Sequence, residues 1–210
     1  MSYGFLDIAI TPSVRAVQEE MGVARLWENF RGERASDRFT RSEEMFIAQR
    51  DSFYMASVSE TGWPYVQHRG GPAGFLKLID ERTLAFADYS GNRQYISTGN
   101  VAASARVCLF LMDYPRRTRL KIYAHADVLA LDAEPELTAK VDPQGYRAQP
   151  ERLFRLRLDA FDWNCPQHIT PRFTESEITA AVRPLRDRLT ELEAENAALR
   201  ARLGGEDGQA

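Results

Sequence analysis

The sequence predicts a mainly β fold of the α+β class: an antiparallel β-barrel, closed or nearly closed, with flanking helices and a C-terminal coiled-coil helix. Three observations carry this prediction. At least six short runs rich in aromatic and β-branched residues are separated by turn signals at hairpin spacing. The long run 117–131 alternates apolar and polar side chains, so one of its faces is buried. The tail carries a leucine-rich heptad pattern.

Composition narrows the class of protein. A chain of 210 residues suits one domain with appendages, and 44% hydrophobic with 27% charged residues is typical of a soluble globular protein. Because 27 basic residues are outnumbered by 30 acidic ones, we expect no nucleic-acid partner. Two cysteines and three scattered histidines form no disulfide framework and no metal-ligand spacing, which favours a cytoplasmic setting without a metal. No apolar run is long enough for a membrane span, so we expect no membrane partner.

The first fifty residues are predicted to be a helical segment that packs on the barrel. Thr11 and Pro12 predict a helix that ends at Gly22, and a second short helix follows through Trp27. After a polar loop at 32–39, a further helix opens near Ser42.

The barrel itself is expected over residues 51–173. A polar stretch at 90–104 interrupts the strands, and a short helix is predicted at 134–141. The predicted strands are 52–59, 63–69, 75–79, 83–89, 106–113, 117–131 and 151–161.

The tail is predicted to form a helix or coiled coil over 174–204, followed by a disordered end at 205–210. Thr174 and Glu177 have the spacing of a capping box, and Pro184 is expected to kink or restart the helix. Leucines then recur at alternating spacings of four and three, which is the pattern of a coiled-coil seam.

The heptad register of the tail favours a parallel pair. With Leu189 at position a, Asn196 occupies the next a, where one buried amide selects a parallel, in-register dimer. Arg188 would then face Glu193 of a partner helix, and Glu195 would face Arg200. The alternative is an amphipathic helix packed on its own barrel, because so short a coil is marginal alone.

One candidate binding segment is the turn that follows the strand 83–89. The segment runs over residues 88–93, from Asp88 at the end of the strand through Ser90 and Asn92 to Arg93, and it leads into a predicted helix that starts at Arg93. Free amides at a helix start, a hydroxyl and a guanidinium together suit a phosphate group. The alternative is that Ser90 and Asn92 only cap the helix and Arg93 is a surface charge.

A second candidate segment is the glycine-rich stretch 67–74, between two predicted strands. Its glycines would let a flat ligand approach the backbone closely. It matches neither a Walker loop nor a dinucleotide fingerprint, so nucleotide hydrolysis and Rossmann-type binding are not supported. The alternative is an ordinary glycine-rich hairpin or bulge.

Taken together, three runs resemble the pyridoxamine 5'-phosphate oxidase-like family, the FMN-binding split barrels. They are FYMASVSETGWPYVQHRGGPAGFLKLID, TLAFADYSGNRQYISTGN and RVCLFLMDYPRRTRLKIYAHADVL, and the resemblance covers about residues 43–170. It implies a homodimer with FMN in the groove between subunits. The cofactor-binding residues that it implies are Ser90 and Arg93 with Asn92 and Gln94 at the phosphate, Gln67, His68 and Arg69 along the ring or ribityl chain, Arg119 from the partner subunit, and Trp163 beside the flavin.

The sequence departs from the true pyridoxamine 5'-phosphate oxidases at two places. They follow the tryptophan with an Arg-x-His element and carry a lysine on the second strand, whereas this chain has Asn164, Cys165 and Pro166 after Trp163, and Gly-Gly-Pro on the strand. The substrate therefore cannot be carried over. Cys165 and His168 lack an orienting third group, so a buried cysteine at a proline turn is expected rather than a nucleophile with its base.

The resemblance leads us to expect an FMN-dependent oxidoreductase that acts on an unidentified small molecule, with no catalytic residue assigned. The alternative is a flavin-binding protein without turnover, such as a carrier, scavenger or sensor. A deazaflavin or haem ligand in the same barrel is a further possibility.

Overall fold

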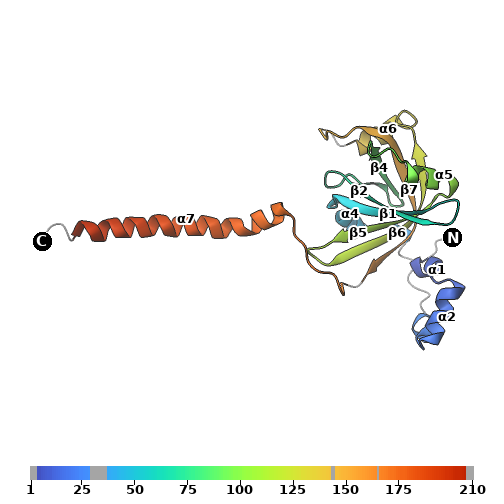
Figure 1. Ribbon diagram of the computed structural model, residues 1–210, viewed down its shortest axis with the longest axis horizontal. Coiled ribbons are helices and arrows are strands. Elements are labelled where there is room, and N and C mark those ends of the chain that lie inside the picture. The colour runs from blue at the N-terminus through green and yellow to red at the C-terminus, as the bar shows by residue number, and fades with distance from the viewer. Residues whose placement is uncertain (1–3, 29–36, 143–144, 165, 207–210) are drawn as a thin grey trace. The chain divides into compact units, whose positions relative to one another are not determined.

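A seven-stranded antiparallel sheet forms the centre of the computed structural model, which describes residues 4–28, 37–142, 145–164 and 166–206. The chain divides into two compact units, residues 1–169 and residues 170–210. The sheet belongs to the first unit, and a single long helix dominates the second (Figure 1). No helix among the described residues is both long and apolar enough to cross a membrane.

The strands agree closely with the predicted runs. In the sheet they lie in the order β2-β1-β5-β6-β7-β4-β3, so β2 and β3 are its two edges. Their bounds are β1 Ser52–Val58, β2 Pro64–Gly70, β3 Lys77–Asp80, β4 Thr83–Tyr89, β5 Arg106–Asp113, β6 Thr118–Leu129 and β7 Pro150–Asn164.

The sheet curls around its apolar side chains into an open barrel. Phe53 of β1 lies 5.3 Å from Phe86 of β4, between ring centroids, although three strands separate β1 from β4 in the hydrogen-bonded order. The ring of Phe75, which precedes β3, stacks on Phe53 at 5.5 Å. The predicted split β-barrel with flanking helices is therefore confirmed, and the sheet is split between β2 and β3 rather than closed.

Strand β4 is covered on both faces. Leu84 and Phe86 point into the barrel core, whereas Ala85 and Ala87 belong to a second apolar cluster that includes Leu137 of helix α6 (Pro135–Val141). All residues from 84 to 88 are buried, which leaves Asp88 as the one buried carboxylate at the end of this strand. A charge in such a position requires a partner.

Of the six helices that the structure describes in this unit, four lie against the sheet. α4 lies beside β3, α5 beside β1 and β6, α6 beside β4, and α1 beside β7. α2 buries no residue. Their bounds are α1 Phe5–Ala9, α2 Pro12–Glu20, α3 Ala24–Glu28, α4 Arg41–Ala48, α5 Ile96–Ala103 and α6 Pro135–Val141.

The N-cap of α4 fixes this helix to the end of β7. Thr40 and Glu43 form a capping box, and the second carboxylate oxygen of Glu43 accepts a 2.7 Å hydrogen bond from the indole of Trp163. Burial alone would raise the pKa of Glu43, but the hydrogen bonds from Thr40 and Trp163 outweigh it and hold the pKa below its ordinary value. Trp163 also packs edge-on against Phe46 at 4.8 Å.

The second unit consists mainly of α7, Glu175–Glu206. Its predicted capping box is confirmed: the amide of Thr174 donates to Glu177 at 2.8 Å, and the amide of Glu177 donates to the Thr174 hydroxyl at 3.3 Å. Pro184 was predicted to kink or restart the helix; a restart is not seen, because α7 continues through this residue, and a kink stays a prediction. Pro184 is exposed, so water can satisfy the carbonyl group that the missing amide leaves free.

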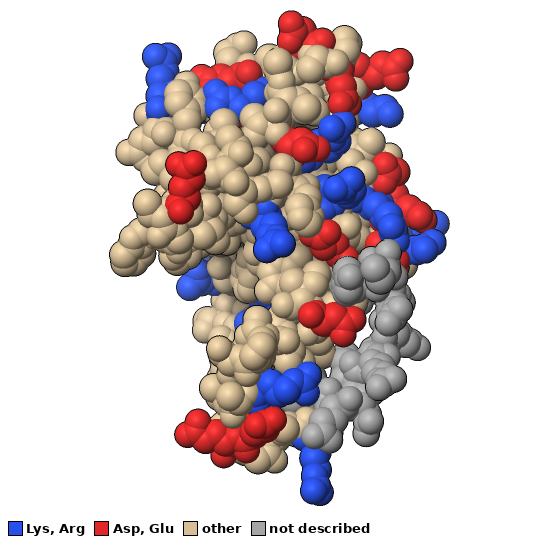
Figure 2. Space-filling view, turned by 90° about the vertical axis from the view of Figure 1, so that its right-hand side faces the viewer, with Lys and Arg blue, Asp and Glu red and all other residues tan. Residues whose placement is uncertain are grey.

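Charged side chains are mixed on the face of the molecule shown in Figure 2. Blue and red groups alternate around its margin and neither sign gathers into one large patch on this face. Residues other than Lys, Arg, Asp and Glu, drawn in tan, lie between the charged groups over much of this face.

Candidate functional site

A cleft lies where β2 approaches the end of β4. It consists of two adjoining hollows that share four lining residues: Gln67, Arg69, Asp88 and Tyr89. The first hollow is polar and extends over the turn after β4, with further lining by Gly91, Asn92, Arg93, Tyr95, Ser97, Thr98 and Glu151. The second reaches toward the core, with further lining by His68, Gly70, Phe75, Phe86 and Ala87.

A buried ion pair joins the two walls of this cleft. A terminal nitrogen of Arg69 on β2 contacts Asp88 on β4, and their side chains are 12% and 8% exposed. The guanidinium of Arg69 also lies over two aromatic rings, 5.7 Å from the centroid of Phe86 and 5.2 Å from that of Phe154. The Nε atom of Arg69 is buried and makes no hydrogen bond to any described residue. One buried donor beside the cleft thus lacks a hydrogen-bond partner among the described residues.

Arg152 of β7 extends the network toward the polar hollow. Its Nε lies 3.8 Å from Asp88, one terminal nitrogen donates to Glu151 at 2.7 Å, and the other donates to the Thr98 hydroxyl at 3.1 Å. Three guanidinium groups lie in this region, those of Arg69, Arg93 and Arg152. Only two carboxylates, Asp88 and Glu151, lie beside them. The balance of charge in this region therefore favours an anionic ligand.

Burial dominates the ionisation of the groups in the cleft. It raises the pKa of Asp88, against the opposing effects of Arg69 and Arg152, and it lowers the pKa of Arg69. Burial, with smaller effects of Tyr146 and Asp142, raises the pKa of Tyr89 to about 12. The Tyr89 hydroxyl is therefore protonated at neutral pH.

The turn between β4 and α5 differs from the predicted geometry. α5 begins at Ile96, not at Arg93, and its N-cap residue Tyr95 makes no side-chain capping bond. Arg93 and Tyr95 both have left-handed backbone conformations, with φ of 58° and 52°. Asn92 accepts a 3.1 Å hydrogen bond from the amide of Gln94. The prediction that Arg93 opens the helix was wrong, because this local turn delays the first helical residue by three positions.

The glycines after β2 have a packing role that the sequence did not reveal. A Cβ atom on Gly71 would lie 2.7 Å from Cγ of Phe75, so the buried ring of Phe75 requires glycine there. Gly74 has φ of 76°, and a Cβ atom on it would lie 2.9 Å from the carbonyl oxygen of Ala48. The core thus accounts for both glycines without a ligand.

A comparison with protein-family models matches residues 39–164 to pyridoxamine 5'-phosphate oxidase. The match covers more than half of the chain. The chain belongs to this family. The resemblance read from the sequence is thereby confirmed, and no protein of curated function matches the chain closely.

The solved structures that resemble this chain do so only distantly. HupZ of Group A Streptococcus is 15% identical with a TM-score of 0.49, covering 64% of this chain and 100% of its own. An FMN-binding protein from Syntrophomonas wolfei is 14% identical with a TM-score of 0.44, covering 73% and 95%. HutZ, a haem storage protein from Vibrio cholerae, is 16% identical with a TM-score of 0.40, covering 60% and 94%. At these values they do not decide between ligands.

The cleft brings together five of the nine residues that the pyridoxamine 5'-phosphate oxidase resemblance implied. They are Gln67, His68, Arg69, Asn92 and Arg93. Gln67 accepts a 2.8 Å hydrogen bond from Ser97 of α5, which ties β2 to the helix. His68 lines the second hollow, but because side chains alternate along β2 its ring lies on the opposite face from Gln67 and Arg69 and meets Tyr54 edge-on at 5.5 Å.

The other four residues do not line the cleft. Ser90 and Gln94 belong to the same turn and are exposed; the amide of Ser90 donates to the carbonyl of Gln149 at 3.0 Å. Arg119 lies on the outer face of β6, opposite in direction to the buried Leu120, and its Nε atom is buried without a hydrogen bond to any described residue. Trp163 is held by Glu43 and Phe46 of α4. Cys165 lies outside the described residues.

Sequence reasoning missed Asp88 and Arg152 as members of the site. Asp88 opened the candidate segment 88–93 but was given no role in binding, and Arg152 was predicted only as part of the last strand. The two residues pair directly across β4 and β7. A carboxylate at the end of an otherwise apolar strand, where all residues from 84 to 87 are buried, was a usable signal for a buried charge.

Proposed function

We propose that this chain is an FMN-binding flavoprotein, and that it is an FMN-dependent oxidoreductase for a small molecule. Membership of the pyridoxamine 5'-phosphate oxidase family supports this proposal. The observation that carries it is the cleft in which Gln67 and Arg69 of one strand meet Asn92 and Arg93 of a distant turn.

The residues of the cleft fit the two ends of FMN. A phosphate needs cationic and amide donors, which the exposed Arg93 and Asn92 would supply. The ring system needs donors near the atoms where reduction adds negative charge; the amide of Gln67 would supply one, and the unsatisfied Nε of Arg69 would supply another if ligand binding uncovers it. The adjoining hollow offers apolar surface from Phe75 and Phe86.

The chain's own residues would mainly bind and orient. FMN, when bound, supplies a ring that takes up a hydride at N5. The Arg69–Asp88 pair would hold one donor of the cleft in a fixed position, since both groups are buried and strands on either side anchor them. Such a reaction requires positioning more than acid–base assistance, in keeping with the absence of an assigned catalytic residue.

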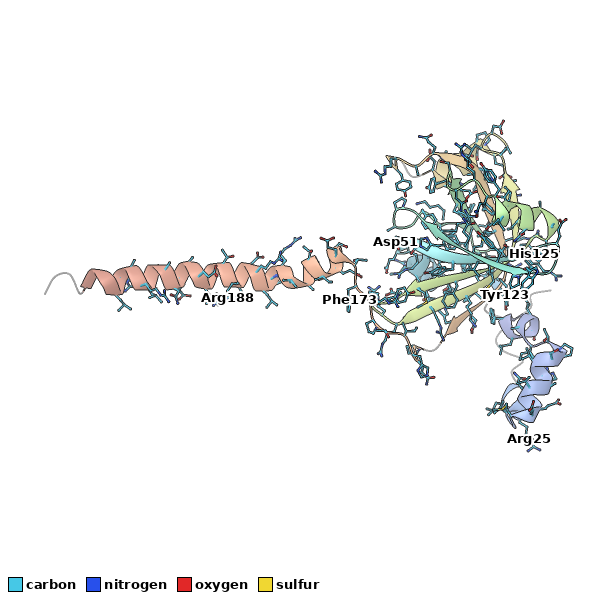
Figure 3. All side chains as sticks on the ribbon, in the orientation of Figure 1. Arg25, Asp51, Tyr123, His125, Phe173 and Arg188 are labelled. Carbon is cyan, nitrogen blue, oxygen red and sulfur yellow. The ribbon has the colours of Figure 1, made fainter. Side chains whose placement is uncertain are left out.

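A homodimer with FMN at the subunit interface is part of the proposal. The outer face of β1 and β2 exposes apolar side chains, with Tyr54 40%, Val58 45% and Val66 59% exposed. A neighbouring part of the same sheet face is already covered: Phe5 of α1 stacks on Tyr123 of β6, which Figure 3 marks beside His125. The remaining apolar surface, together with the unsatisfied Nε of Arg119, is suited to burial by a second subunit.

Purified protein is expected to carry FMN or to bind it with a stoichiometry of one per chain, and Arg93→Ala is expected to weaken binding. Loss of a charge-assisted hydrogen bond costs about 1.5–3 kcal/mol, or roughly a tenfold to hundredfold rise in Kd. Quenching of FMN fluorescence during titration of the apoprotein measures both quantities.

Arg117→Ala is the matched control for this titration. Arg117 is also an exposed arginine in a turn, with φ of 53° against 58° for Arg93, but it does not line the cleft. The control should bind FMN like the unaltered chain. A colourless protein that fails to quench added FMN would refute flavin binding, and equal affinities of the two variants would remove Arg93 from the site.

Pyridoxamine 5'-phosphate is expected to be a poor substrate of the FMN-loaded protein. The Arg-x-His element and the strand lysine of the true oxidases are missing from this chain. Oxygen-dependent formation of pyridoxal 5'-phosphate, followed by absorbance, should stay far below an ordinary enzymatic turnover of roughly 1 per second. Turnover at that rate would contradict this expectation.

Reductants separate the oxidoreductase from a flavin-binding protein without turnover. NADH, NADPH or a small organic donor is added anaerobically, and the absorbance of the bound flavin is followed. Bleaching by one of them, with the colour restored by an acceptor over many cycles, would support an oxidoreductase. Bound flavin that no donor reduces would support the carrier, scavenger or sensor instead.

A further inference from the structure

Helix α7 carries a narrow apolar seam that nothing within its own unit covers. The leucines of this seam remain accessible, from 44% exposed for Leu192 to 70% for Leu185. The seam residues alternate at spacings of four and three: Ile178, Val182, Leu185, Leu189, Leu192, Asn196, Leu199 and Leu203. This is the a and d pattern of a coiled coil over nearly four heptads.

The flanks of the seam argue against burial on a broad globular surface. From residue 186 onward, every e and g position is charged: Arg186, Arg188, Glu193, Glu195, Arg200 and Arg202. A helix that packs on a globular core needs an apolar stripe wider than the a and d positions, with e or g included. Burial against a barrel would desolvate at least one of these charged rows, whereas a partner helix leaves both rows at the edge of the interface.

Pro184 lies outside the seam. With Leu189 at position a, Pro184 occupies position c, and it is exposed. The helix continues through it. The residue that was expected to interrupt the pattern therefore leaves the a and d residues on both sides of it in one continuous helix.

We propose that α7 pairs with α7 of a second copy of this chain in a parallel, in-register, two-stranded coiled coil. Asn196 is the only polar residue in the seam, and at position a two such amides can hydrogen-bond to each other only when the helices are parallel and in register. In an antiparallel pair, position a packs against d, so each amide would face a leucine and lose its partner.

Charge complementarity supports the same partner. In the parallel arrangement Arg188 at g meets Glu193 at e of the other helix, and Glu195 at g meets Arg200 at e. Arg188, marked in Figure 3, already lies 2.9 Å from Glu191 of its own helix and is 61% exposed, so its guanidinium can reach over the edge of the seam. Each attraction occurs twice in a symmetric pair.

Single cysteines at three positions of the seam test orientation and register together. The full-length chain with Cys108 and Cys165 replaced by serine provides the background, and Leu189→Cys, Asn196→Cys and Leu203→Cys are introduced singly. Each should form a disulfide-linked dimer under mild oxidation, at least about tenfold more than a collisional control, because equivalent a positions face each other. Non-reducing electrophoresis measures the yield.

Ala194→Cys is the matched control. Ala194 lies on the same helix at position f and is exposed, so its thiol should point away from the partner. Circular dichroism of each variant checks that the helix persists.

Three outcomes would overturn the proposal. Absence of crosslinking in variants with intact helicity would mean that the seam is not paired with another copy. Crosslinks only in a mixture of Leu189→Cys with Leu199→Cys prepared on the same background, and in neither alone, would mean an antiparallel pair, because an a position then faces a d position. Equal crosslinking of Ala194→Cys and the seam variants would mean random collision. Failure of the chain to bind FMN would contradict the proposed function of the barrel, and it would not change the outcome of this crosslinking test.

Discussion

Asp88→Ala is expected to lower the free energy of unfolding by about 3–5 kcal/mol, because it leaves the guanidinium of Arg69 buried without its counter-charge. The two side chains are 8% and 12% exposed, so water cannot replace the lost carboxylate. Arg152 would lose a neighbour as well, since its Nε lies 3.8 Å from Asp88. Urea unfolding of the FMN-free protein, followed by tryptophan fluorescence, measures the change.

Asp127→Ala is the comparison for this variant. Asp127 is also a strand carboxylate paired with an arginine, at 3.1 Å from Arg155, but it is 57% exposed. An exposed pair contributes under about 1 kcal/mol, so the two variants should differ by several-fold. Equal, small effects would mean that water enters the cleft and solvates Arg69 freely.

Phe86→Ala is expected to cost about 3–5 kcal/mol by the same unfolding measurement, because it removes a ring from the centre of the barrel core. Phe86 is 1% exposed. Its ring stacks on Phe154 at 5.1 Å and meets Phe53 edge-on at 5.3 Å, so β1, β4 and β7 all lose a contact. Arg69 would also lose one of the two rings beneath its guanidinium.

Phe173→Ala is the control for the loss of a phenylalanine as such. Phe173 is 59% exposed, and we expect an effect within about 0.5 kcal/mol. A Phe86→Ala variant that is destabilised by less than about 1 kcal/mol would show that the curled sheet does not depend on this aromatic cluster.

The strands could be predicted because their burial depends on local alternation. β6 has Leu120, Ile122, Ala124 and Ala126 buried in sequence alternation, as predicted. The start of α5 could not be predicted in the same way. It depends on left-handed backbone conformations at Arg93 and Tyr95. Such conformations are uncommon for residues other than glycine, and the residue types in this turn do not predict them.

Only part of the candidate site could be predicted from the sequence, because the contacts between its residues form only when the sheet curls. Gln67 and Arg69 could be named from the sequence, but their partners Ser97 and Asp88 come within reach only when β2 folds back toward β4. The packing role of Gly71 could not be predicted for the same reason, because the ring of Phe75 that requires glycine there belongs to the folded core.

The two walls of the cleft differ in how firmly they are held, and this bears on how a ligand can enter. β4 is hydrogen-bonded on both sides and buried on both faces, so its amides should open only when the barrel unfolds as a whole. β2 is an edge strand in which no residue is fully buried, and among the described strands only β1 pairs with it. Local opening at β2 can therefore admit a bulky ligand while β4 keeps its hydrogen bonds. Such opening has to break the Arg69–Asp88 contact, which joins the two strands.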